Sequence, residues 1–246
     1  MNIGILGSGA IGAVLSDRLA EAGHDVVIAN SRGPETITPT ALRGGARAVE
    51  AGAAVRGVDV LILSVPLHRV PDLAPLVVQT PPGAVIIDTS NYYPQRDQRI
   101  AAIEDGQVES MWVAEQLGRP IVKAWNAVGS GVLEAAEPDS GTTERVAIPV
   151  AGDNIDTKRI AMNLVELTGL DAVDAGSLAD SWRQQPGTPV YCTARSAEEI
   201  PSLLEAANAA SAPRRRDIVA AAMEERMQTD GSVTADYLTQ LNRAVY

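Results

Sequence analysis

The feature that most constrains the fold is the first twelve residues, MNIGILGSGAIG. A short apolar run, 3–6, breaks into a glycine pattern and is followed by apolar residues at helical spacing, which predicts a strand, a tight turn and a helix. In such a unit the first glycine makes the turn, the second lets a pyrophosphate approach the backbone, and the third lets the helix pack on its strand. The unpaired N–H groups and positive dipole end of the helix favour phosphate. We predict a dinucleotide site made by Gly7, Ser8, Gly9, Ala10, Ile11 and Gly12.

The end of the second predicted strand, 25–29, indicates which dinucleotide binds. Folds that prefer NAD carry an acidic residue there for the adenosine ribose, whereas this chain has Asn30, Ser31 and Arg32. A carboxylate would repel a 2′-phosphate, but a guanidinium and a hydroxyl can donate hydrogen bonds to it. We therefore predict NADP(H) as the cofactor, with these three residues at the 2′-phosphate. The alternative is that Arg32 only begins a surface loop.

The rest of the chain alternates apolar runs with helical patterns, which is typical of an α/β protein. We predict a Rossmann-type, doubly wound, mainly parallel sheet with a small α-rich C-terminal part. The predicted NADP-binding domain is 1–150, and a smaller C-terminal α/β region that ends in helices is 151–246. The further predicted strands are 46–49, 58–65, 84–88, 120–124, 145–151 and 171–175, and the further predicted helices are 34–43, 67–78, 95–104, 108–117, 154–168 and 197–209, with another from 213.

Residues that follow the predicted strands are the candidates for the nicotinamide and substrate site, because ligands of parallel α/β sheets bind at the carboxyl edge. Ser64, Val65 and Pro66 follow 58–65 and are predicted to form a nicotinamide wall. The segment 89–94, TSNYYP, concentrates hydroxyl, amide and aromatic groups suited to a substrate floor, including Asn91. The tyrosines of this segment, Tyr92 and Tyr93, have plain packing as their alternative role.

Few side chains are candidates for catalysis. His68 is the only histidine placed for acid/base work, with a solvated loop histidine as the alternative, and Asn126 is a candidate to hold the nicotinamide carboxamide. Lys123 is a candidate to neutralise an anionic substrate, and 129–131 is predicted to be a loop. In the helix 154–168, which Gly152 and Asp153 are predicted to cap, Lys158 is expected on the exposed side.

Composition excludes several classes of function. The formal net charge of −11 disfavours binding to nucleic acid or to anionic membranes, since both carry phosphates. No apolar run approaches the length of a membrane span, and the start shows no secretory signal pattern. Cys192 is the only cysteine, so no internal disulfide can form, and the two histidines lie in no ligand cluster. We therefore expect a cytoplasmic protein without a metal site.

Together these motifs resemble the coenzyme F420-dependent NADP oxidoreductase family. The likeness covers about residues 1–190 and is carried by GSGAIG, NSRG, the strand into Val65-Pro66, KAWN at 123–126, PVAGDN at 149–154 and DAGSLADS at 174–181. The resemblance implies hydride transfer between C4 of the nicotinamide and C5 of a deazaflavin stacked on it, or a flavin-like acceptor in its place. It also implies that Ser31 and Arg32 contact the 2′-phosphate, and Ser8 stands where the family often has a hydroxyl residue.

The chain departs from the family in its tail, beyond 188–192. Arg214, Arg215 and Arg216 fall in the first turn of a predicted helix, where positive charge is unfavourable, so they either meet an anion such as a carboxylate-rich deazaflavin tail or form a solvated basic face. The tail could cover the pocket or form a dimer contact, and we expect a homodimer. Two other functions stay open: an NADPH-dependent reductase of a small carbonyl or imine, and a non-catalytic NADP(H) sensor.

Overall fold

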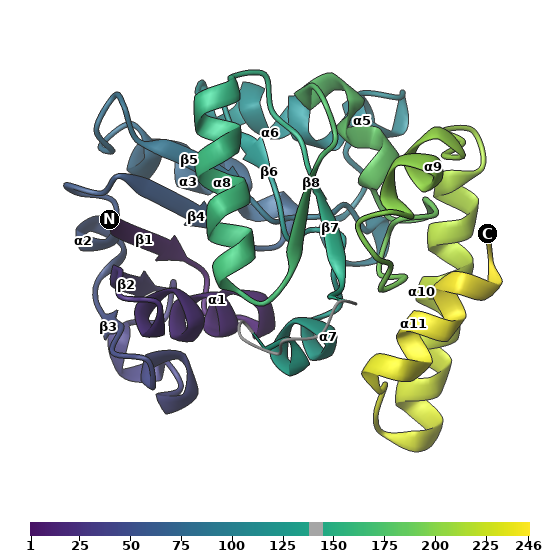
Figure 1. Cartoon of the computed structure of the whole chain (residues 1–246), viewed down its shortest axis with the longest axis horizontal. Helices are drawn as coiled ribbons and strands as arrows, with labels where there is room; N and C mark the ends of the chain where they lie inside the picture. Colours follow the sequence, from purple (N-terminus) through teal and green to yellow (C-terminus); the bar gives the residue numbers. More distant parts are fainter. Residues whose placement is uncertain (138–144) are drawn as a thin grey trace.

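A six-stranded parallel sheet organises the computed structural model, which describes residues 1–137 and 145–246 (Figure 1). The strand order is β3-β2-β1-β4-β5-β6, the doubly wound order of a Rossmann fold, so the predicted fold class is confirmed. The strands are β1 (Asn2–Leu6), β2 (Asp25–Ala29), β3 (Arg47–Ala48), β4 (Val60–Leu63), β5 (Val85–Asp88) and β6 (Val122–Lys123).

Alternate residues of the central strands supply two separate cores, one on each face of the sheet. In β4, Val60 and Ile62 belong to one apolar cluster, whereas Leu61 and Leu63 belong to the other. This alternation follows from the two-residue period of a strand, and it explains why the run is apolar throughout. The register sets Leu6 beside Leu63 and Ala29, so three strands end together at the carboxyl edge.

Helices cover both faces of the sheet. On one face α1 (Ala10–Glu21) and α8 (Ile155–Leu167) contribute buried leucines to the first core cluster. On the other face α3 (Val70–Val77) and α6 (Glu109–Leu117) contribute to the second. The shorter helical elements along the sheet are α2 (Ala51–Ala54), η3 (Leu67–Arg69), α4 (Pro94–Asp97) and α5 (Ala101–Glu104).

A second, two-stranded parallel sheet adjoins the main one. Its strands are β7 (Ala147–Val150) and β8 (Asp171–Asp174). Ala151, directly after β7, forms an antiparallel bridge with Lys123 of β6, in which each backbone N–H donates to the other carbonyl at 2.8 and 3.0 Å. The predicted domain boundary at residue 150 therefore falls where the two sheets are hydrogen-bonded, and the division into domains stays a prediction.

The C-terminal part is helical, as predicted, and ends in a helical hairpin. After η4 (Leu178–Gln184) and α9 (Ile200–Glu205), α10 (Ala212–Asp230) and α11 (Ala235–Ala244) lie side by side at the opposite end of the molecule from the N-terminus (Figure 1). The start of α11 packs closely on α7 (Ser130–Ala135), because a Cβ built on Gly131 would lie only 2.8 Å from that of Ala235. Among the described helices, none combines the length and apolar character that a membrane span requires.

Several predicted elements were wrong in detail, and each has a local cause. The helix predicted for 34–43 is two 3₁₀ turns, η1 (Pro34–Thr36) and η2 (Pro39–Leu42), each begun by a proline. The helix predicted for 95–104 is interrupted by Gln98, whose φ of 61° is left-handed. The loop predicted at 129–131 is the start of α7.

The predicted cap of α8 was also wrong. Asn154, and neither of the two residues before it, is the N-cap of this helix. Its side-chain oxygen accepts hydrogen bonds from the backbone N–H groups of Asp156 and Thr157 at 2.9 and 3.1 Å. Asparagine caps a helix well because it satisfies N–H groups of the first turn that have no partner within the helix.

Candidate functional site

In the glycine turn between β1 and α1, the fold requires glycine at two positions and does not require it at a third. Gly7 has φ 111°, and a Cβ built on it would lie 2.0 Å from the carbonyl oxygen of Ser64. A Cβ on Gly12 would lie 2.0 Å from the carbonyl oxygen of Gly7. Gly9, by contrast, has ordinary extended backbone, and a Cβ there would meet none of the described atoms within 4 Å. Gly9 therefore faces open space at the N-terminus of α1.

The N-terminus of α1 fits a pyrophosphate. Gly9 is the N-cap, no side chain of the described residues caps the helix, and the first turn holds no acidic residue. The N–H groups of the first turn are thus left for a ligand, and the helix dipole favours a negative charge at this point. The turn accordingly meets the geometric and electrostatic requirements of the predicted dinucleotide site.

On one side of the glycine turn lies a hollow of about 420 Å³, which we call the adenosine hollow. Asn30, Ser31 and Arg32 all line it, together with the carboxyl end of β4 and the start of α3. The Asn30 side chain donates to the Ser8 hydroxyl at 2.9 Å and accepts from the Arg32 backbone N–H at 2.8 Å. Asn30 therefore fixes the loop, while the side chains of Ser31 and Arg32 are left at the surface of the hollow.

Arg69 is a candidate residue that the sequence analysis missed. It lines the adenosine hollow, and its Nε lies 3.2 Å from a carboxylate oxygen of Asp72. The hollow thus offers a second guanidinium besides Arg32. The sequence feature that could have identified Arg69 is its position three residues after Pro66, where the predicted strand ends, since residues that follow a strand lie at the carboxyl edge of the sheet.

On the other side of the glycine turn lies a hollow of about 330 Å³, which we call the nicotinamide hollow. It is bounded by the glycine turn, by the ends of β4, β5 and β6, and by the C-terminal hairpin. Of the predicted cofactor-binding residues, those that line it are Gly9, Ala10, Ile11, Ser64, Val65, Pro66, Asn91 and Asn126. Ser90 and Tyr93 of the predicted substrate floor also line it, and its further lining residues include Arg96, Tyr191, Cys192, Met223 and Leu238. Gly9, Ser64, Val65 and Pro66 line both hollows, so the two meet at the glycine turn.

The two asparagines of the nicotinamide hollow bind each other. The Asn126 side-chain amide donates to the Asn91 side-chain oxygen at 3.1 Å and to the Gln184 carbonyl at 2.8 Å. Its oxygen accepts from the Gln184 amide at 2.8 Å, and Asn91 donates to the Asn126 backbone carbonyl at 3.0 Å. Asn126 thus has protein partners at both ends of its amide. Its contact with the nicotinamide carboxamide stays a prediction.

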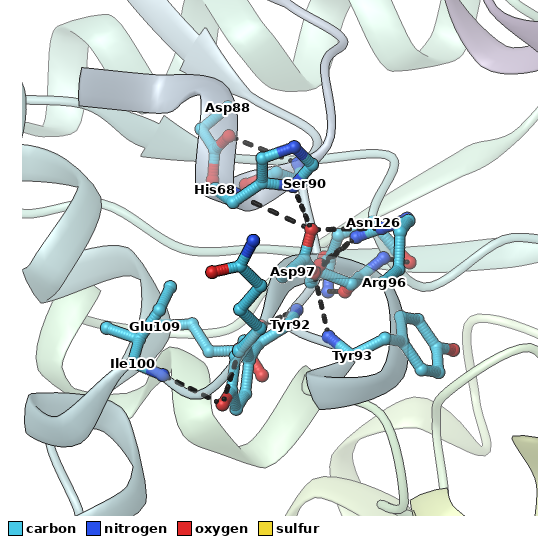
Figure 2. A network of polar contacts seen from close by, with 12 residues as sticks. His68, Asp88, Ser90, Tyr92, Tyr93, Arg96, Asp97, Ile100, Glu109 and Asn126 are labelled. Carbon is cyan, nitrogen blue, oxygen red and sulfur yellow. Dashed lines mark hydrogen bonds and ion pairs between the residues drawn. The ribbon is translucent and has the colours of Figure 1, made fainter. Parts of the chain in front are cut away.

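His68 belongs to a carboxylate network beside the nicotinamide hollow and is not among the described residues that line it (Figure 2). Its Nδ1 lies 2.8 Å from Oδ1 of the buried Asp97, which also accepts from the Arg96 guanidinium and from the Tyr93 backbone N–H. Burial acts to raise the pKa of Asp97, but the hydrogen bonds from Arg96 and His68 outweigh it and hold the pKa below its ordinary value. An acid/base role for His68 stays a prediction.

Both lysines have roles that differ from those predicted. Lys123 is 0% exposed, its Nζ lies 2.6 Å from Asp88 Oδ2, and it also donates to the Ser90 carbonyl, so it is not available to a substrate. Lys158, expected to be exposed, is buried and lies 2.6 Å from a carboxylate oxygen of Asp174. The helical pattern could not show that β8 and the turn after it cover this side of α8.

Ser90 presents an unpaired hydroxyl in the nicotinamide hollow. The residue is 4% exposed, and its Oγ has no hydrogen-bond partner among the described residues. Since buried polar groups are nearly always hydrogen-bonded, this hydroxyl is suited to a ligand that enters the hollow. Lys123 Nζ donates a hydrogen bond to the backbone carbonyl of the same residue.

The tyrosines of 89–94 and the tail arginines have different environments. Tyr92 is fully buried in the second core cluster, and its hydroxyl donates to Glu104 at 2.8 Å, so for Tyr92 the packing alternative was right. Tyr93 instead lines the nicotinamide hollow. Arg216 is buried with its guanidinium 5.3 Å from the centroid of the Tyr92 ring, and Arg215 lies over Tyr246.

Glu109, at the start of α6, gives a pH-dependent prediction. It is 3% exposed, and burial raises its pKa from 4.5 to about 7. The folded-state pKa exceeds the unfolded value, so this carboxyl stabilises the fold below about pH 4.5 and that stability is lost as the pH rises through about 7. We expect Glu109→Gln to match the wild type near pH 4.5 and to be more stable by about 3 kcal/mol above pH 7, at roughly 1.4 kcal/mol per pKa unit.

Urea unfolding at pH 5 and pH 8 measures this difference in the free energy of unfolding. The glutamine oxygen can still accept the Tyr92 backbone N–H, which lies 3.0 Å from Glu109 Oε2, so the substitution removes the charge and keeps the bond. A difference between the two proteins that is the same at both pH values would contradict the assignment.

Comparison with known proteins agrees with the predicted family. Residues 2–92 match the family described as NADP oxidoreductase, coenzyme F420-dependent. The solved structure of the protein SMa0349 from Sinorhizobium meliloti is 34% identical, with a TM-score of 0.66, over 77% of this chain and 92% of that one.

Two curated proteins match over part of their length. The Escherichia coli protein YjhV is 52% identical over 52 residues, which are 21% of this chain and 38% of that protein. The metalloreductase STEAP3 of Rattus norvegicus is 27% identical over 180 residues, 73% of this chain and 34% of that protein. The chain thus spans little more than a third of the length of the curated relatives that it matches.

Proposed function

Because residues 2–92 match the family described as NADP oxidoreductase, coenzyme F420-dependent, we propose that the chain passes a hydride between NADP(H) and a planar acceptor, either a deazaflavin such as coenzyme F420 or a flavin. The observation that supports this best is the meeting of the two hollows at the glycine turn. An extended dinucleotide with its pyrophosphate at Gly9 would place its adenosine in one hollow and its nicotinamide in the other.

The residues of each hollow suit one part of the cofactor. Ser31, Arg32 and Arg69 would bind the 2′-phosphate, since hydroxyl and guanidinium groups both donate to phosphate oxygens. The backbone of the glycine turn would bind the pyrophosphate, and Ser64, Val65 and Pro66 would support the nicotinamide. When bound, the reduced nicotinamide supplies the hydride.

Arg96 supports an anionic acceptor. Among the described residues that line the nicotinamide hollow, it is the only one with a charged side chain. Its guanidinium is half exposed, and its charge is partly offset by the bidentate contact with Asp97 at 3.0 and 2.7 Å. A carboxylate or phosphate on the acceptor would be attracted to this point. The first requirement for hydride transfer is that the protein stacks the two reactants at the correct distance.

Arg32→Ala tests the cofactor. We expect it to raise the dissociation constant for NADPH by about 10- to 100-fold and to leave that for NADH nearly unchanged, because a charge-assisted hydrogen bond contributes about 1.5–3 kcal/mol. Nucleotide fluorescence measures both constants. Arg159→Ala, which removes an exposed arginine on α8, is the matched control and should change neither constant. Equal losses for NADPH and NADH in Arg32→Ala would exclude the proposed 2′-phosphate contact.

The acceptor is tested by mixing the purified protein with NADPH and one of several oxidants while nicotinamide absorbance is followed. The panel comprises a deazaflavin, FMN, FAD, simple carbonyls and imines. Oxidation with tricyclic acceptors alone supports the proposal. Oxidation with carbonyls or imines would support the small-substrate reductase instead. NADPH binding without turnover would favour a sensor.

A further inference from the structure

Two tyrosines meet in the wall of the nicotinamide hollow. Tyr93 follows β5, and Tyr191 lies in the turns after η4, 98 residues later in the chain, yet their hydroxyl oxygens are 2.8 Å apart. Both residues line the hollow, as does the neighbouring Cys192, and the three pack together in a small apolar cluster. The hydroxyl pair is thus placed at the candidate site by the fold, and neither hydroxyl is at the outer surface.

The pair retains its protons at neutral pH. Burial raises the pKa of Tyr93 and of Tyr191 well above the ordinary value for a phenol, and it raises the pKa of the Cys192 thiol to about 12. The thiol is therefore a poor nucleophile. Two neutral hydroxyls carry two protons, and the bond between them uses one. When Tyr191 donates to the Tyr93 oxygen, the Tyr93 proton is left to donate to a group that enters the hollow.

Arg96 makes Tyr93 the better donor of the two. Its guanidinium carbon lies 5.4 Å from the centroid of the Tyr93 ring, and this positive charge favours the phenolate that remains after proton transfer. Tyr191 can donate to the same phenolate oxygen from 2.8 Å. A hydrogen bond and a nearby cation are the two effects that lower the cost of ionising a buried group.

We propose that Tyr93 is the catalytic proton donor to the acceptor and that Tyr191 is the positioning residue that holds its hydroxyl. This inference rests on the proposed function. A hydride adds two electrons and one hydrogen to a ring atom of the acceptor, C5 in a deazaflavin or N5 in a flavin, and the displaced electron pair moves to a conjugated ring nitrogen or oxygen. The O–H bond of Tyr93 breaks as that atom takes the proton, and a proton from water then restores the phenol. The sum is NADPH, one proton and the oxidised acceptor giving NADP⁺ and the reduced acceptor.

Tyr93→Phe is the direct test. General acid catalysis contributes about 10²- to 10⁴-fold, so we expect kcat with the best acceptor of the panel to fall at least about 100-fold. Equilibrium binding of NADP⁺ and of oxidised FMN, each followed by fluorescence without turnover, should change by no more than about threefold. Tyr191→Phe keeps the donor and loses its partner, so its kcat should fall by less, about tenfold.

Tyr237→Phe is the matched control, because Tyr237 lies on α11 and lines neither hollow among the described residues. It should leave kcat and both dissociation constants unchanged. Wild-type kcat in Tyr93→Phe would overturn the inference, and so would losses of FMN binding as large as the loss of kcat, which would indicate packing alone. If none of the acceptors in the panel supports NADPH oxidation by the wild type, the proposed function fails before Tyr93 is tested. The two failures are therefore distinguishable.

Discussion

Replacement of Lys123 by Met is expected to lower the free energy of unfolding by about 3–5 kcal/mol, because removing one partner of a buried ion pair leaves the other charge uncompensated. Lys123 and Asp88 are each 0% exposed, and Nζ lies 2.6 Å from Oδ2. The same lysine donates to the Ser90 carbonyl, so its loss also leaves a buried backbone acceptor without this donor. Urea unfolding followed by circular dichroism measures the change.

The double variant Lys123→Met/Asp88→Asn is the matched control for this prediction. The amide oxygen introduced at position 88 can still accept a hydrogen bond from the Ser90 backbone N–H, which lies 3.1 Å from Asp88 Oδ1 in the wild type. Because both charged side chains are replaced, neither charge is left buried without its partner. We expect the double variant to be more stable than Lys123→Met alone. A single variant as stable as the wild type would show that the lysine contributes nothing net, as some buried ion pairs do.

Gly9→Ala is expected to lose NADPH binding and keep its stability, whereas Gly7→Ala is expected to lose stability. Gly9 has φ −71°, and a Cβ there meets no described atom within 4 Å, so Gly9→Ala should fold with unchanged or slightly greater stability. Its methyl group would occupy the space that the pyrophosphate approaches. We therefore expect the dissociation constant for NADPH to rise at least about 100-fold, which corresponds to about 2.7 kcal/mol.

Gly7→Ala should instead damage the fold itself. Its φ of 111° is unfavourable for alanine, and the added Cβ would lie 2.0 Å from the Ser64 carbonyl oxygen, which belongs to backbone and cannot rotate away. We expect a loss of at least about 3 kcal/mol in the free energy of unfolding, combining backbone strain with overpacking.

Thermal unfolding and NADPH titration of the same two variants separate the effects. A stable Gly9→Ala protein that binds NADPH as tightly as the wild type would show that the pyrophosphate does not bind at the glycine turn. A Gly7→Ala protein of wild-type stability would mean that the turn can relax around the new methyl group.

The tail illustrates how the structure narrows alternatives that the sequence left open. From residues alone, the helices after 192 could cover the pocket or make a dimer contact. In the structure Met223 of α10 and Leu238 of α11 line the nicotinamide hollow, and Arg243 donates to the Thr193 and Ala194 carbonyls at 2.8 and 2.7 Å. The hairpin is thus one wall of the candidate site. The homodimer stays a prediction.

The sequence by itself determined the sheet, the glycine turn and the residues that follow the strands. β2 begins and ends where the pattern predicts, and Asn30, Ser31 and Arg32 lie beside the glycine turn because β1 and β2 pair in register. These features depend on local rules: a two-residue or 3.6-residue period, and glycine where the backbone must turn tightly.

Tertiary structure alone decided the partners of the charged and polar side chains. Lys123 meets Asp88 across 35 residues, Tyr93 meets Tyr191 across 98, and Lys158 is buried by a strand that the helical pattern does not register. Arg69 reaches the adenosine hollow for the same kind of reason. Periodicity reports which face of an element is apolar, but burial and pairing depend on which other segment packs there, and distant segments leave no mark on that local pattern.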